Sequence, residues 1–71
     1  MNTEALVLRT LDARGVVTLT LNRPMAFNAL SEGMLAALQA ELDRVAAEDT
    51  ARVVVIAGAG KAFCAGHDLK E

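Results

Sequence analysis

The sequence is poor in several residue types that commonly support small proteins. Among 71 residues it has one cysteine, one histidine and one proline, and only 3% of its residues are aromatic. A single cysteine cannot form a disulfide within the chain, and one cysteine with one histidine is too small a ligand set for a structural zinc site. Cores of this size are marginal without such supports. Since 54% of the residues are nevertheless apolar, the composition indicates an oligomer or part of a longer polypeptide.

Charge and hydropathy exclude further classes. The net charge is −2 and the pI is near 5.2, which argues against a non-specific nucleic-acid partner. No window approaches the roughly 18 apolar residues that would span a bilayer, so no membrane association is expected. Glu4 stands where a signal peptide carries positive charge, and no long apolar segment follows it. These features favour a cytoplasmic protein, and a lone Cys64 is compatible with a reducing compartment.

The first part of the chain predicts an antiparallel hairpin. Residues 5–10 (ALVLRT) and 16–21 (VVTLTL) are rich in strand formers, and Asp12 and Gly15 between them suit a turn. Val17, Leu19 and Leu21 alternate with residues of the other face, so they are the candidate core side of the second strand. Pro24 ends this strand because it has no N–H to donate.

A helix and a third strand are predicted next. Ser31 is a candidate N-cap, with Glu32 in the first turn where the helix dipole favours negative charge. The expected apolar stripe consists of Leu35, Leu38, Leu42 and Val45. Residues 52–56 (RVVVI) read as a strand buried on both faces and parallel to its neighbour. The resulting β-α-β crossover places the following loop, residues 57–66 (AGAGKAFCAG), at the carboxyl end of a strand, where ligands collect in α/β sheets.

Three functional motifs that this loop resembles are incomplete or poorly supported. A phosphate-binding P-loop needs Ser or Thr after Gly60-Lys61 and finds Ala62, and a dinucleotide fingerprint begun by Gly58 and Gly60 meets Phe63 at its third glycine position. Cys64 as a nucleophile with His67 as base lacks an orienting group. The plain alternatives are a small buried Cys64 and an exposed His67 at a helix start.

The backbone of the loop offers a better candidate. Gly66 permits close approach to a ligand, and the first amides of a following helix have no acceptor within that helix. The His67 N–H is therefore a candidate for half of an oxyanion hole, which stabilises negative charge developing on a carbonyl oxygen. An ordinary tight loop that caps a helix has the same spacing.

Three segments in order carry a family resemblance: LNRP…NAL after the second strand, VVVIAGAGKAF across the third, and AGHDLKE at residues 65–71. The sequence resembles the crotonase superfamily, the enoyl-CoA hydratase/isomerase family. The resemblance implies an α/β chain with the crotonase-like ββα spiral fold. Residues 1–71 would be the N-terminal part of an incomplete domain: a β-hairpin, a helix, a parallel strand and the start of the next helix.

The same resemblance implies roles for individual residues. The backbone N–H of His67, where many family members have alanine, corresponds to an oxyanion-hole donor to a thioester carbonyl. Binding of the acyl-CoA substrate is implied for Met25, Ala26, Phe27, Gly66, His67, Asp68, Leu69 and Lys70. Arg23 and Lys70 are candidates for contacting the anionic groups of coenzyme A. For Arg23, a solvated surface cation is an equally good reading.

The resemblance implies an enzyme that stabilises a thioester enolate, with no metal or redox cofactor and with coenzyme A arriving as part of the substrate. The full-length protein is expected to be a homotrimer or hexamer. The second oxyanion donor and the catalytic acids of the family have no counterpart in these residues, so the 71-residue chain alone is expected to be inactive. Two alternatives stay open: a non-catalytic crotonase-like module that binds acyl-CoA or associates with homologues, and a nucleotide-phosphate binder using AGAGK.

Overall fold

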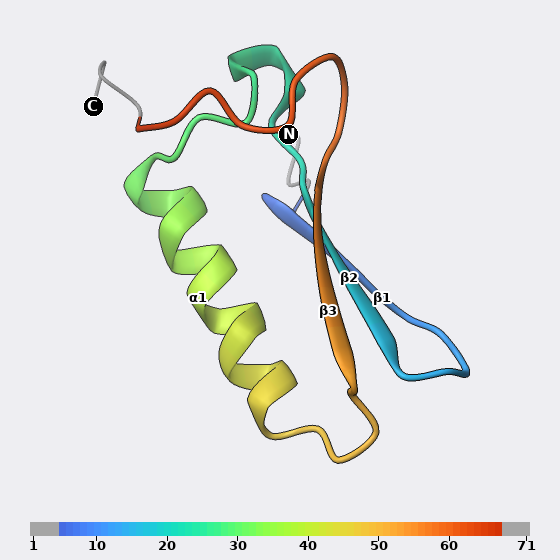
Figure 1. Cartoon of the computed structure of the whole chain (residues 1–71). Helices are drawn as coiled ribbons and strands as arrows, with labels where there is room; N and C mark the ends of the chain where they lie inside the picture. The colour runs from blue at the N-terminus through green and yellow to red at the C-terminus, as the bar shows by residue number, and fades with distance from the viewer. Residues whose placement is uncertain (1–4, 68–71) are drawn as a thin grey trace.

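One helix packs on one face of a three-stranded sheet (Figure 1). The computed structural model describes residues 5–67. Its elements are β1 (Val7–Leu11), β2 (Val16–Leu21), the 3-10 helix η1 (Pro24–Ala26), α1 (Glu32–Ala46) and β3 (Val53–Gly58). The sheet order is β1-β2-β3, with β1 antiparallel and β3 parallel to the central strand. The predicted hairpin and β-α-β crossover are therefore confirmed, with strand ends shifted by one or two residues in β1 and β3.

The turn between β1 and β2 is held by a side chain. The Asp12 carboxylate accepts hydrogen bonds from the backbone N–H groups of Arg14 (2.8 Å) and Val16 (3.0 Å). Gly15 follows with φ of 85°, a conformation that favours glycine. A Cβ at Gly15 would also lie 2.5 Å from the Thr50 carbonyl oxygen. The turn thus fixes the hairpin register and touches the segment entering β3.

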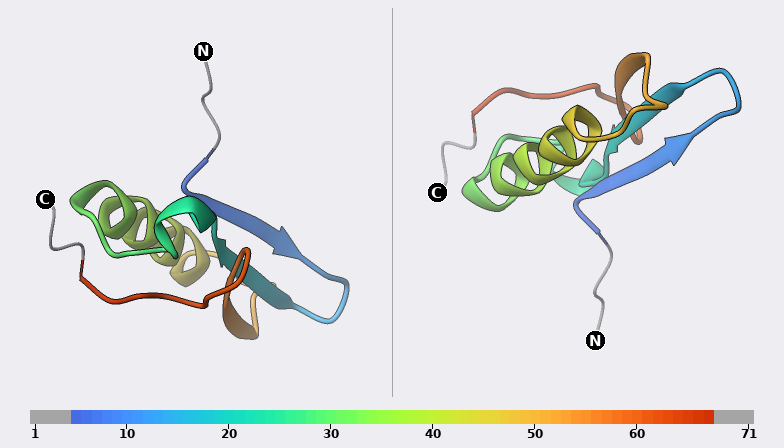
Figure 2. Two further views of the ribbon diagram at one scale, coloured as in Figure 1. Left: turned by 90° about the horizontal axis from the view of Figure 1, so that it is seen from above. Right: turned by 90° about the horizontal axis from the view of Figure 1, so that it is seen from below.

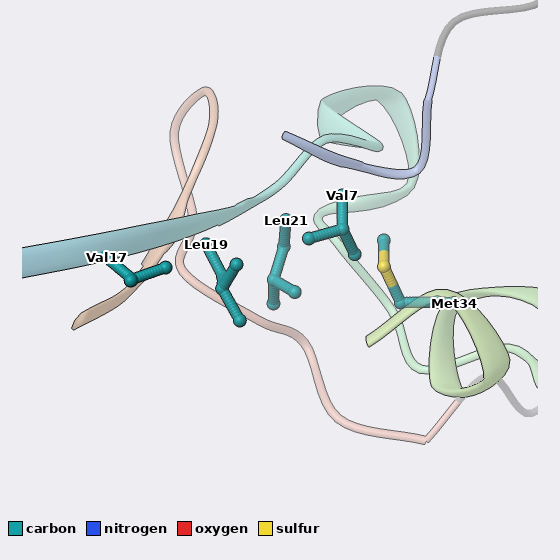
Figure 3. Packing of buried hydrophobic residues seen from close by; sticks show 5 residues of the cluster. All are labelled: Val7, Val17, Leu19, Leu21 and Met34. Atoms are coloured by element: carbon teal, nitrogen blue, oxygen red, sulfur yellow. The ribbon is translucent and has the colours of Figure 1, made fainter. Parts of the chain in front are cut away.

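The core lies between α1 and the β1–β2 hairpin. Its buried apolar side chains are Val7, Val17, Leu19, Leu21 and Met34. Figure 3 shows the three β2 side chains on one face of the strand, with Met34 directed from α1 toward Val7. The predicted inward face of β2 is confirmed, since its members are at most 2% exposed.

The predicted apolar stripe of α1 is confirmed at Leu38, Leu42 and Val45, which pack against the core, and is wrong at Leu35. Leu35 is 45% exposed, whereas Met34 is fully buried. Successive residues of a helix are separated by about 100°, because there are 3.6 residues per turn. Met34 and Leu38 share the face that meets β1 and β2, whereas Leu35 is not among the residues packed against the core.

A group of ion pairs joins β1 of the sheet to α1 and to Glu48, which follows the C-terminal end of the helix. Arg9, on the same side of β1 as Val7, donates from Nη2 to Glu48. Its Nε lies 3.8 Å from a carboxylate oxygen of Glu41. All three side chains are partly buried, so their attraction is screened less than that of fully exposed charges.

The prediction that β3 is buried on both faces is wrong for this chain. Its first four side chains, Val53 to Ile56, are between 38% and 53% exposed. β3 pairs with β2 along one edge only, and α1 packs against β1 and β2. The β-branched sequence of β3 is typical of a strand covered on both faces. Within residues 5–67, β3 does not have such covering layers.

Removal of the α1 cap is expected to destabilise the protein measurably. Ser31 is only 7% exposed, and its Oγ accepts a hydrogen bond from Met34 N at 3.1 Å. Ser31→Ala should lower the free energy of unfolding by about 1 kcal/mol, measured by urea denaturation. Ser31→Thr keeps the hydroxyl and should lose less. Equal losses in the two variants would show that the hydroxyl is not the stabilising group.

Candidate functional site

Two loops lie side by side beyond the carboxyl ends of β2 and β3 (Figures 1 and 2). The η1 loop comprises residues 22–31 and the β3 loop comprises residues 59–67. Ala65 N donates to the Phe27 carbonyl at 2.9 Å, and Leu30 N donates to the Gly66 carbonyl at 2.7 Å. Leu30 and His67 also form an isolated parallel bridge, to which the Leu30–Gly66 bond belongs. The sequence predicted a loop at this place, and the structure adds its pairing partner.

The η1 loop holds the first predicted binding segment, Met25 to Phe27. Phe27 N donates to the Pro24 carbonyl at 3.0 Å, closing a 3-10 turn for which proline's fixed φ is suited. Phe27 and Asn28 both have φ near +54° (53° and 54°), so the chain reverses direction sharply after η1. Met25 is 97% and Phe27 53% exposed, which leaves two large apolar side chains on the surface.

Two glycines allow the β3 loop to fold back. A Cβ at Gly58 would lie 2.4 Å from the Phe63 carbonyl oxygen. At Gly60, φ is 82° and a Cβ would lie 2.7 Å from the Pro24 Cβ. The glycines of AGAG are therefore needed for close approach of backbone to backbone and of the two loops to each other, which requires no phosphate ligand.

Asn28 connects the two loops and was missed by the sequence analysis. It is completely buried, and its Oδ1 accepts from Arg23 N at 2.8 Å. Its Nδ2 donates to the carbonyl oxygens of Ala59 (2.9 Å), Ala62 (2.9 Å) and Phe63 (3.1 Å). The available signal was asparagine's tolerance of positive φ, but sequence alone does not show which carbonyls its amide reaches.

The peptide between Gly66 and His67 has a defined orientation. In a trans peptide the C=O and N–H groups point in opposite directions. Because the Gly66 carbonyl accepts from Leu30 N, the His67 N–H points away from the η1 loop. Within residues 5–67, no backbone acceptor receives this N–H. The arrangement leaves one donor directed outward from the paired loops.

Gly66 has a left-handed backbone conformation and open space beside its Cα. Its φ is 95°, and a Cβ built there meets no described heavy atom within 4 Å. Gly66 N in turn donates to Cys64 Sγ at 3.4 Å. Gly66 thus combines a conformation that favours glycine with open space on the side where a side chain would stand.

The side chains of Cys64 and His67 do not form a catalytic pair in the described structure. Cys64 is half-buried and packs against the core, as the plain reading predicted. His67 is exposed, and no hydrogen bond joins the two side chains in the region that the structure describes. Asp68, Leu69, Lys70 and the predicted start of a second helix lie outside the described residues.

Residues 5–67 hold no group of three or more histidine, cysteine or acidic side chains arranged to bind a metal ion. In the same range, α1 is neither long nor apolar enough to cross a bilayer.

The sequence profile described as enoyl-CoA hydratase/isomerase matches residues 16–71. The chain belongs to this family. It is 47% identical over 58 residues to 1,2-epoxyphenylacetyl-CoA isomerase of Escherichia coli K12, a match covering 82% of this chain and 22% of that protein. It is 56% identical over 59 residues to mevalonyl-coenzyme A hydratase of Beauveria bassiana, covering 79% and 20% of the two chains.

Solved structures of the enoyl-CoA hydratase/isomerase family give the same result for the fold. An enoyl-CoA hydratase of Mycobacterium smegmatis superposes with a TM-score of 0.90 and 64% sequence identity, covering 94% of this chain and 26% of that one. The predicted crotonase-like ββα architecture is thereby confirmed for this segment. The chain spans between a fifth and about a quarter of the length of these relatives.

Two glycine substitutions in this family segment should have different effects on stability. Gly58→Ala forces a Cβ against backbone and should lower the free energy of unfolding by about 2 kcal/mol, within the range for overpacking. Gly66→Ala meets open space and should lose about 1 kcal/mol, from its positive φ alone. Urea unfolding of both variants measures the difference. A Gly58→Ala variant as stable as wild type would contradict the close approach.

Proposed function

We propose that this chain is the N-terminal part of an enzyme that binds acyl-CoA thioesters and stabilises the thioester enolate. The His67 N–H would serve as one of two backbone donors to the thioester oxygen. The observation that carries this proposal is the Leu30–Gly66 hydrogen bond of 2.7 Å, because it turns the next N–H away from the paired loops. Membership of the enoyl-CoA hydratase/isomerase family supports the reaction class.

The physical basis is electrostatic. As a proton leaves the carbon beside the carbonyl, or as water adds, negative charge grows on the thioester oxygen. A fixed N–H directed at that oxygen stabilises the charged state without reorienting during the reaction. A backbone donor does not depend on the side chain, which is why histidine at position 67 is compatible with the role.

Coenzyme A would lie along the η1 loop. Met25 and Phe27 offer exposed apolar surface there, with Ala26 between them. Asp68, Leu69 and Lys70 would continue the binding segment after His67, as the family resemblance implies. Arg23 and Lys70 are the cations proposed to approach the anionic groups of coenzyme A.

The remaining catalytic groups would come from sequence beyond residue 71. Relatives that this chain matches are roughly four times its length, since matches of 58 and 59 residues cover 22% and 20% of them. The second oxyanion donor and the acids that transfer protons are assigned to that part, so the 71-residue chain alone should be inactive. Three further statements stay predictions. They are that the protein uses no metal or redox cofactor, that it forms a homotrimer or hexamer, and that it is cytoplasmic.

The exposure of β3 favours a second candidate, a non-catalytic module that associates with full-length homologues. An open apolar strand edge pairs readily with another chain, and Val53 to Ile56 are 38% to 53% exposed. The mass of the natural protein separates the two candidates. A product much heavier than 7.5 kDa excludes the module, whereas a stable 7.5 kDa product supports it.

Two substitutions at one position test the backbone donor. His67→Pro removes the N–H, while His67→Ala keeps it. In the intact protein, turnover of a short 2-enoyl-CoA should fall on the order of 10²–10³-fold for His67→Pro, as for loss of one oxyanion donor.

His67→Ala is the matched control and should stay within a few-fold of wild type. Circular dichroism checks that both variants fold. Equal turnover by the two variants would exclude the His67 N–H as a donor to the substrate.

A further inference from the structure

Asn28 lies outside the residues assigned to substrate contact, and it has more side-chain hydrogen bonds in the site region than its neighbours. We infer that Asn28 is a positioning residue that sets the His67 N–H against the coenzyme A segment of the η1 loop. This inference rests on the proposed function, because it concerns the same thioester oxygen. It assigns to a buried carboxamide a role that the exposed binding residues do not have.

The two ends of the carboxamide act on different loops. Oδ1 accepts from Arg23 N at 2.8 Å, within the η1 loop. Nδ2 donates to Ala59, Ala62 and Phe63 carbonyl oxygens at 2.9 to 3.1 Å, within the β3 loop. One planar group therefore fixes the distance between the loops, and its complete burial removes competition from water.

The effect on His67 is transmitted through the backbone. Asn28 lies between Phe27, whose carbonyl accepts from Ala65 N, and Leu30, whose N–H donates to Gly66. Both of these hydrogen bonds belong to the contact that orients the Gly66–His67 peptide. If Asn28 no longer holds residues 59–63, this contact loses its support from the β3 side. Small displacements matter here, since a misplacement of about 1 Å can reduce a rate about 10²-fold.

Two variants separate the functions of the two ends. Asn28→Asp is nearly isosteric and keeps an acceptor for Arg23 N, but it replaces the Nδ2 donor by an oxygen facing three carbonyl oxygens. Asn28→Gly retains easy access to positive φ but removes both the Oδ1 acceptor and the Nδ2 donor. Val17→Ala is the control. Val17 is buried in the core near the start of β2, at the end of the strand away from the two loops, and it has no assigned part in binding or catalysis.

In the intact protein with a short 2-enoyl-CoA, Asn28→Asp should lower kcat on the order of 10²-fold and change KM by less than about three-fold. Asn28→Gly should lower kcat similarly and also raise KM, because the η1 loop loses its internal bond. Val17→Ala should lower the melting temperature and keep kcat. A purely structural role for Asn28 predicts instead that kcat per folded molecule is unchanged, and this result would overturn the inference.

A spectroscopic readout keeps this test distinct from a failure of the proposed function. Donation to the thioester oxygen shifts the carbonyl stretch of a bound acyl-CoA to lower frequency in an infrared difference spectrum. A wild-type shift that disappears in Asn28→Asp, and persists in Val17→Ala, supports the positioning role. A wild-type shift that is unchanged in both Asn28 variants overturns the positioning role alone. The lack of any shift in wild type overturns the proposed oxyanion donor itself.

Discussion

The hydrogen bonds of the Asn28 carboxamide are the constraint on which the site depends. Neither the η1 loop nor the β3 loop has regular secondary structure beyond one 3-10 turn and one isolated bridge. Their backbone groups need partners when they are buried, and Asn28 supplies them for three carbonyls of one loop and one N–H of the other. Within residues 5–67, this buried side chain and the Ala65–Phe27 and Leu30–Gly66 backbone hydrogen bonds join the two loops.

The sheet and helix place these loops at the same end of the molecule. β2 and β3 are parallel neighbours, so the chain leaves both strands at one edge, and Leu21 and Gly58 are register partners there. The buried face of β2 and Met34 of α1 form the core behind them. Packing of ordinary aliphatic residues thus sets the geometry in which a backbone donor faces outward.

Much of this fold could be predicted from local patterns. The alternation in residues 16–21 gave the bounds and inward face of β2, and the Ser31 cap gave the start of α1, because both depend on residues close in sequence. The apolar stripe of α1 was predicted correctly at Leu38, Leu42 and Val45, but its first member could not be fixed, since Leu35 and Met34 are both apolar and only contact with β1 and β2 selects Met34. Burial of β3 on both faces was predicted from its β-branched composition, but Val53 to Ile56 are 38% to 53% exposed among residues 5–67, because burial depends on packing that composition does not specify.

By itself, the sequence determined the order of elements, the family and the segment in which a donor would lie, because hydrophobic period, capping and spaced motifs are local properties of the chain. Tertiary structure alone decided that the Gly66 carbonyl faces Leu30, that the next N–H faces outward, and that Asn28 joins residues 59–63 to Arg23. The contacts between the two loops join residues more than thirty positions apart in the sequence. The direction of the His67 N–H depends on how one peptide plane is oriented. No local preference specifies such a choice, since a peptide plane has similar energy in several orientations until a partner accepts or donates its hydrogen bond.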